Sequence, residues 1–167
     1  MKWDEYITLP VVERRKALAR DIVAAVKAKK LIASIEYLQV AYIEEEIEEG
    51  ICAACAIGAS YMASVNFNPK EASDRIYYLD FIRNGCEHTM ALAGFDFKAT
   101  KYIEDMFEAN TCAPELHREY PLRINRLEAL WQMIADSTDG LPLGYISAKG
   151  EIYIARFQAS LVEGEVG

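Results

Sequence analysis

The chain has 167 residues and a net charge of −8, and 52% of its residues are hydrophobic. This is the usual length of one domain, and the apolar fraction is high enough to build a core, which excludes an intrinsically disordered chain. A negatively charged protein repels a phosphate backbone, so direct binding of nucleic acid is disfavoured. We therefore expect a single globular domain over residues 1–167.

The sequence also bears on the cellular compartment. Residues 1–10 include Trp3, Asp4 and Glu5 and lack the basic and then apolar order of a signal peptide. No apolar run reaches the roughly 18 residues that a membrane-spanning helix needs. Four cysteines are too few for the disulfide scaffold of a small exported protein. These features predict a cytoplasmic protein with reduced thiols and no membrane partner.

Two blocks of opposite charge stand out. Residues 1–30 carry eight Lys and Arg against four Asp and Glu, whereas residues 31–50 carry six Glu and no basic residue. Such blocks are commonly solvated surface, but an acidic patch also attracts a basic cleft and speeds encounter with it. Five glutamates form the candidate partner-binding surface: Glu44, Glu45, Glu46, Glu48 and Glu49.

The first half of the chain predicts one amphipathic helix and two apolar segments. Residues 10–30 have helical spacing of apolar side chains, with Pro10 in the first turn and lysines at the end. Residues 34–42 alternate as a strand does, although a helix face also fits. The small apolar residues from Cys52 to Val65 predict a buried helix that allows close approach of its neighbours.

Further helices follow, among them one or two helical turns over Cys86–Ala93. Asn68 can cap a helix that has Pro69 in its first position, and Asn84-Gly85 predicts its end. A second helix is expected at residues 98–109. Pro121 opens the last clear helix, whose expected core face is Leu127, Leu130, Trp131 and Ile134.

The end of the chain changes in character. Residues 145–147 and 152–157 predict two short strands around a turn at Gly150. Two strands alone are marginally stable, so residues 34–40 are the natural third strand. The sequence therefore predicts a helix-rich α+β fold in a single domain, with a small antiparallel β-sheet.

Cysteines and histidines are the candidates for a metal site. The Cys-x2-Cys pair at Cys52 and Cys55 has the spacing of half a zinc site, and a second half needs a Cys and a His. The alanines between the two thiols favour a continuous helix over a bent zinc knuckle, so buried thiols without a metal or a cofactor are the preferred interpretation. The remaining candidates are Cys86, His88, Cys112 and His117.

Two catalytic arrangements compete with these interpretations. A thiolate of Cys52 at a helix start could act as a nucleophile with a histidine base, although the preceding glutamates would raise its pKa. Glu104 and Glu108 share a helix face beside Asp105 and could bind a divalent cation or transfer protons. Carboxylates at such a spacing are more often solvated surface.

Several short motifs follow one another along the chain. They are Cys55-Ala56-Ile57-Gly58-Ala59, Phe95-Asp96 and Tyr102-Ile103-Glu104, after the basic helix of residues 10–30 and the extended segment of residues 34–42. In this order, over residues 15–135, the chain resembles a diffuse group of small uncharacterised proteins of phages and mobile elements. The resemblance carries over no functional residue. It implies a context in which accessory proteins inhibit host defence, as small acidic anti-CRISPR proteins do.

The sequence thus favours a non-enzymatic protein-binding module. We expect a phage-encoded inhibitor that acts in the host cytoplasm on a CRISPR-type nucleic-acid-handling complex, through the five glutamates and a basic surface of the protein partner. One alternative is a metal- or thiol-dependent enzyme that uses Cys52, Cys55 and a histidine. The other alternative is a homo-oligomeric structural protein with tyrosine-rich interfaces.

Overall fold

The computed structural model describes residues 1–34, 38–39, 51–76 and 82–142. These residues form helices and three short strands, and the predicted helix-rich fold with a small sheet is confirmed. The helices are α1 (Trp3–Thr8), α2 (Val11–Lys27), α3 (Gly58–Ser64), α4 (Pro69–Ile76), α5 (Ile82–Ala93), α6 (Phe97–Glu108), α7 (Pro114–Glu119) and α8 (Arg123–Asp136). The strands are β1 (Leu31–Ala33), β2 (Leu38–Gln39) and β3 (Cys52–Ala54).

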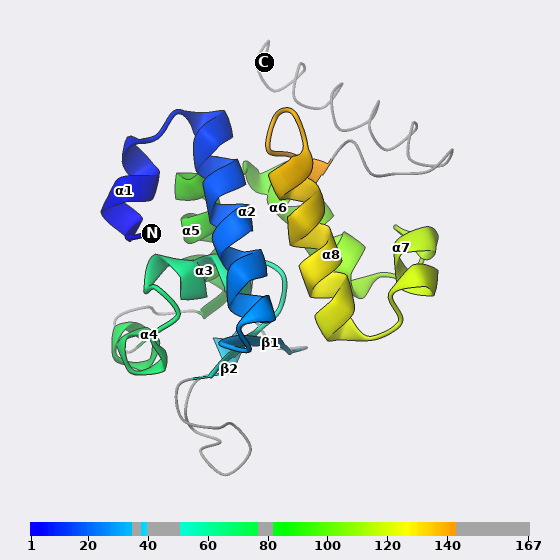
Figure 1. Cartoon of the computed structure of the whole chain (residues 1–167), viewed down its shortest axis with the longest axis horizontal. Coiled ribbons are helices and arrows are strands. Elements are labelled where there is room, and N and C mark those ends of the chain that lie inside the picture. Colours follow the sequence, from blue (N-terminus) through cyan, green and yellow to red (C-terminus); the bar gives the residue numbers. More distant parts are fainter. Residues whose placement is uncertain (35–37, 40–50, 77–81, 143–167) are drawn as a thin grey trace.

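Helices α2 and α8 run side by side in opposite directions through the middle of the molecule (Figure 1). Each contributes an apolar stripe to the core, and Leu18 and Ile22 of α2 are fully buried. The predicted core face of α8 is confirmed, because Leu127, Leu130, Trp131 and Ile134 are all fully buried. The predicted amphipathic helix of residues 10–30 is likewise confirmed as α2, although it ends at Lys27 and not at Lys30.

Trp131 joins this helix pair to the rest of the core. Its indole Nε1–H donates a hydrogen bond of 3.1 Å to the carbonyl oxygen of Ala56, between β3 and α3. The ring of Phe95 meets the indole edge-on, with ring centroids 5.8 Å apart. A buried indole needs such a partner for its N–H group, and here the partner also fixes α8 against the segment after β3.

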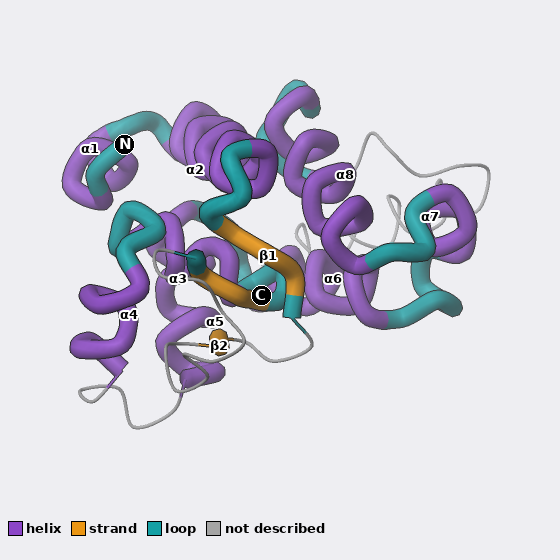
Figure 2. Tube along the Cα trace, turned by 60° about the horizontal axis from the view of Figure 1, so that its bottom comes forward, coloured by secondary structure: helices purple, strands orange, loops and turns teal. Residues whose placement is uncertain are grey.

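The sheet differs from the predicted one. β1 pairs with β3 in parallel, with Leu31 opposite Cys52, and β2 pairs with β3 antiparallel. The prediction of an antiparallel sheet is therefore wrong for the longer of these two pairs. Figure 2 shows the strands at the end of α2, and β1 also contacts α8. The predicted strands at residues 145–147 and 152–157 lie outside the described residues.

Two predicted helix boundaries are wrong. The expected helix from Cys52 to Val65 is a strand over Cys52–Ala54 and a helix only from Gly58. The expected stop at Asn84-Gly85 is absent, because α5 continues to Ala93 and ends at Gly94, whose φ is +105°. The start of α4 is confirmed, since the Asn68 side chain accepts a hydrogen bond from the Glu71 amide at 3.1 Å. Within the described residues, no helix combines the length and the apolar character needed to cross a membrane.

Candidate functional site

The five candidate glutamates lie outside the described residues, so their side chains have no geometry to report. The structure does describe the strands on either side of them. Gln39 of β2 lies opposite Ala53 of β3, and Leu38 lies opposite Ala54. The described residues that flank this stretch of the chain, Gln39 before it and Ala53 after it, therefore pair with each other.

Burial dominates the chemistry of the predicted cysteine site. Cys52 is 1% exposed and Cys55 is 4% exposed. Desolvation raises the pKa of Cys52 to about 12 and the pKa of Cys55 to about 11. Burial also raises the pKa of Cys86, with a further contribution from Cys55. Because the thiolate is the reactive form, these thiols are poor nucleophiles at neutral pH.

The two histidines do not join the cysteines in a recognisable metal site. His88 is exposed on α5. His117 on α7 is half-buried, its Nε2 lies 3.0 Å from the carbonyl oxygen of Met106, and desolvation lowers its pKa. Over residues 1–34, 38–39, 51–76 and 82–142, no three His, Cys, Asp or Glu side chains come together as metal ligands.

The carboxylates of α6 lie at its surface. Asp105 forms an ion pair of 3.9 Å with Lys101, one helical turn earlier. Glu108 is exposed, and partial desolvation raises its pKa against the opposing effect of Arg123 and Arg126. Glu104 is half-buried one turn before Glu108. The contacts of Asp105 and Glu108 are those of a charged helix face.

A surface that sequence analysis missed lies where α1, α2 and α3 meet. One hollow of about 240 Å³ borders α2, and a second of about 340 Å³ borders α1. Asn66 lines both of them. The first is lined by Met1, Asp21, Ala24, Ala25, Ala28, Lys30, Asn66 and Phe67. The second is lined by Lys2, Trp3, Asp4, Ser64, Val65, Asn66 and Glu71.

The turn between the hollows has an unusual backbone. Asn66 and Phe67 have φ angles of +51° and +56°, a backbone region that residues other than glycine rarely occupy. The Phe67 amide donates to the Met62 carbonyl at 2.7 Å, which ends α3 with a left-handed cap. This geometry places the half-buried Phe67 against the core, where its ring lines the first hollow. The sequence signalled only a break at residues 66–68.

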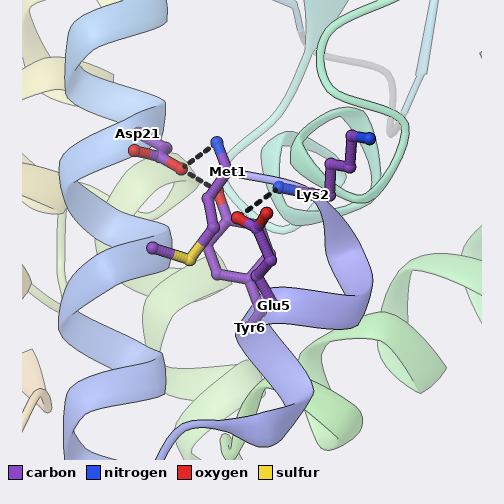
Figure 3. A network of polar contacts seen from close by, with 5 residues as sticks. All are labelled: Met1, Lys2, Glu5, Tyr6 and Asp21. Atoms are coloured by element: carbon purple, nitrogen blue, oxygen red, sulfur yellow. Dashed lines mark hydrogen bonds and ion pairs between the residues drawn. The ribbon is translucent and has the colours of Figure 1, made fainter.

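A polar network anchors α1 beside the hollows (Figure 3). The Met1 ammonium donates to Asp21 Oδ2 at 3.1 Å, and the buried Tyr6 hydroxyl donates to the same oxygen. Burial and then the bond to Asp21 raise the pKa of Tyr6. The Lys2 amide donates to the Glu5 carboxylate at 3.3 Å. The charge of Asp21 is therefore engaged within the fold.

Comparison with known proteins gives no relative: no protein-family profile, no curated protein and no solved structure matches this chain.

Proposed function

We propose that this protein is a non-enzymatic protein-binding module, a phage-encoded inhibitor that blocks a CRISPR-type nucleic-acid-handling complex of its host. Its contact surface is the acidic segment with Glu44, Glu45, Glu46, Glu48 and Glu49. The partner supplies a basic cleft of the kind that normally holds a phosphate backbone. The context of host defence is supported by the resemblance to small phage proteins.

One observation carries the proposal. Residues 40–51 connect two strands that pair with each other, β2 and β3, and they hold five glutamates with no basic residue. Connections between paired strands are common sites of recognition, because loops carried on a scaffold of strands hold many binding residues. The high thiol pKa values of Cys52 and Cys55 further favour binding over thiol chemistry.

The test compares two variants of equal charge. The first replaces the five glutamates of the segment by Gln. The second neutralises five exposed acidic residues elsewhere: Asp4, Glu13, Asp74, Glu108 and Glu119. Each variant has a net charge of −3, against −8 for the parent chain. A difference between the two therefore reports on the segment and not on total charge.

The readout is the plaque count of a phage on a bacterial strain whose CRISPR system targets that phage. Expression of the parent chain is expected to restore plaques, and expression of the control variant is expected to do the same. The segment variant is expected to leave the strain immune. Equal activity of both variants would remove the acidic segment from the mechanism, and no rescue by the parent chain in a panel of CRISPR types would refute the inhibitor function.

A further inference from the structure

Helix α2 carries a line of basic side chains along its outer face. Lys16, Arg20 and Lys27 lie on one face of the helix, and Lys29 and Lys30 follow in the turn after the helix ends. All but the half-buried Lys16 are exposed. With a rise of 1.5 Å per residue, the helical part alone spans about 16 Å. We call these five residues the basic ridge.

The described fold leaves the ridge without neutralising partners. Among the residues that the structure describes, no ion pair involves any of the five, and Asp21 next to the ridge is engaged by Met1 and Tyr6. Lysines at the end of a helix stabilise its dipole, but that effect is confined to the last turn and does not account for Lys16 and Arg20. The cationic face is therefore available to an anion.

A hollow of mixed polarity adjoins the ridge. Ala24 and Ala25 of α2, Ala28 directly after it and Phe67 form its apolar part. Its polar part is formed by Met1, Asp21, Asn66 and Lys30 of the ridge. Its volume of about 240 Å³ is below the roughly 300–1,000 Å³ of sites for small molecules. A hollow of this size with alanine walls suits one apolar side chain of a larger partner.

We infer that the basic ridge and this hollow together bind an acidic segment of a protein partner, with its carboxylates along the ridge and one apolar side chain in the hollow. The argument is charge complementarity on the ridge and apolar burial beside it, the combination that anchors protein interfaces. The net charge of −8 opposes every polyanion alike, so the choice of a peptide over a phosphate backbone rests on the apolar part of the hollow. This surface is distinct from the acidic segment of the proposed function. The ridge binds an acidic partner, whereas the acidic segment binds a basic one.

The experiment measures fluorescence anisotropy of short labelled peptides on the purified chain. The main probe is built of Glu-Glu-Leu repeats, and a second probe of the same length has Glu-Glu-Gly repeats. Single-stranded oligothymidylate of equal charge is the third. The variants are Lys27→Glu with Lys30→Glu on the ridge and Ala24→Phe in the hollow, and Lys101→Glu on α6 is the control. Thermal unfolding of each variant checks that the fold is retained.

The Glu-Glu-Leu peptide is expected to bind the parent chain and the control alike, and about tenfold more weakly to the ridge variant, as two lost charge contacts and two repulsions imply. It is expected to bind at least about threefold more tightly than the Glu-Glu-Gly peptide, and Ala24→Phe is expected to abolish that preference. Equal binding of the two peptides, an unaffected ridge variant or tighter binding of the oligonucleotide would each overturn the inference. None of these outcomes involves the five glutamates, so the proposed function is judged separately.

Discussion

At the scale of single residues, burial decides what the cysteines can do. Cys52 and Cys55 are spaced as metal ligands are, yet both belong to the buried apolar core that also holds Ile57 and Met62. Enclosure disfavours the charged thiolate and raises the pKa of both groups. The spacing of the two residues could be recognised from the sequence, whereas their exposure, which determines their reactivity, depends on packing.

The raised thiol pKa values predict a loss of stability at high pH. In the unfolded chain these thiols have a pKa near the ordinary value of 9.0. In the folded chain Cys55 keeps its proton up to about pH 11 and Cys52 up to about pH 12. Stabilisation is therefore complete below pH 9 and is lost as the pH rises through that window, at up to about 1.4 kcal/mol per pH unit for each thiol. Urea unfolding of the parent chain at several pH values measures the slope.

A double variant, Cys52→Ala with Cys55→Ala, is the control for this effect. Its free energy of unfolding is expected to fall less steeply above pH 9 than that of the parent chain, since the two shifted groups are gone. In the native protein at neutral pH, iodoacetamide is expected to modify the half-buried Cys112 first. Modification of Cys52 at a comparable rate would contradict the assigned burial and would restore the case for a thiol-dependent enzyme.

Arg126 is a second residue whose role depends on burial, and it is 6% exposed. Its Nε donates to the Phe107 carbonyl at 2.8 Å and its Nη1 to the Tyr120 carbonyl at 3.0 Å. The guanidinium carbon lies 5.6 Å from the centroid of the Phe107 ring. One cation on α8 thus satisfies carbonyl groups at the ends of α6 and α7.

Replacing Arg126 is therefore expected to loosen three helices at once. Arg126→Met keeps the aliphatic stem but leaves two carbonyl groups without their donor, which predicts a loss of about 3 kcal/mol in the free energy of unfolding. Arg126→Lys is expected to recover less than half of that loss, because an ammonium lacks the planar fork that reaches both carbonyl groups. Urea unfolding checks both values. Full recovery by Lys would show that charge alone matters at this position.

At the scale of elements, the turn after α8 packs tightly against α2. Gly140 has a φ of +72°, and a Cβ added to it would lie 2.7 Å from the Cβ of Arg15. Gly140→Ala is therefore expected to destabilise the fold by about 2 kcal/mol, through the contact and the strained backbone together. Thermal unfolding measures the loss. Gly140→Asn separates the two causes, since Asn tolerates positive φ but also adds a Cβ, and it is expected to remain clearly destabilised.

The elements also show which parts of the fold the sequence could predict. The start of α4 was predictable, because the Asn68 cap and Pro69 act within one turn of the chain. The strand at Cys52–Ala54 was not, because alanine and cysteine carry no periodic pattern and the strand exists through pairing with Leu31–Ala33, some twenty positions earlier. Helix α7 was missed since its six residues are too few to show a period.

At the scale of the whole molecule, the sequence showed the basic block but not which of its residues form an exposed surface. Arg14 belongs to the same basic block as Lys16, yet its guanidinium donates to the carbonyl groups of Tyr6, Ile7, Leu9 and Leu92 and holds α1 and α5 on α2. Arg20 and Lys27 point outward instead. Counting charges could not separate these roles, because they depend on which neighbours surround α2. The hollow beside the ridge likewise depends on the packing of Met1 and the turn after α3 against α2.

The core provides a last prediction for the molecule as a whole. Its buried apolar residues form one cluster that runs from Tyr6 in α1 to Leu141 after α8, so the described part of the chain is expected to unfold in a single cooperative transition. The two tryptophans can test this from different places, since Trp131 lies in the core and the half-buried Trp3 lies on α1. In Trp3→Phe, the fluorescence of Trp131 and the far-ultraviolet circular dichroism are expected to change at the same urea concentration. In Trp131→Phe, a less stable variant, the Trp3 signal is expected to coincide with its own dichroism midpoint. An earlier Trp3 transition would instead show that α1 detaches separately and that the Asp21 network does not couple it to the core.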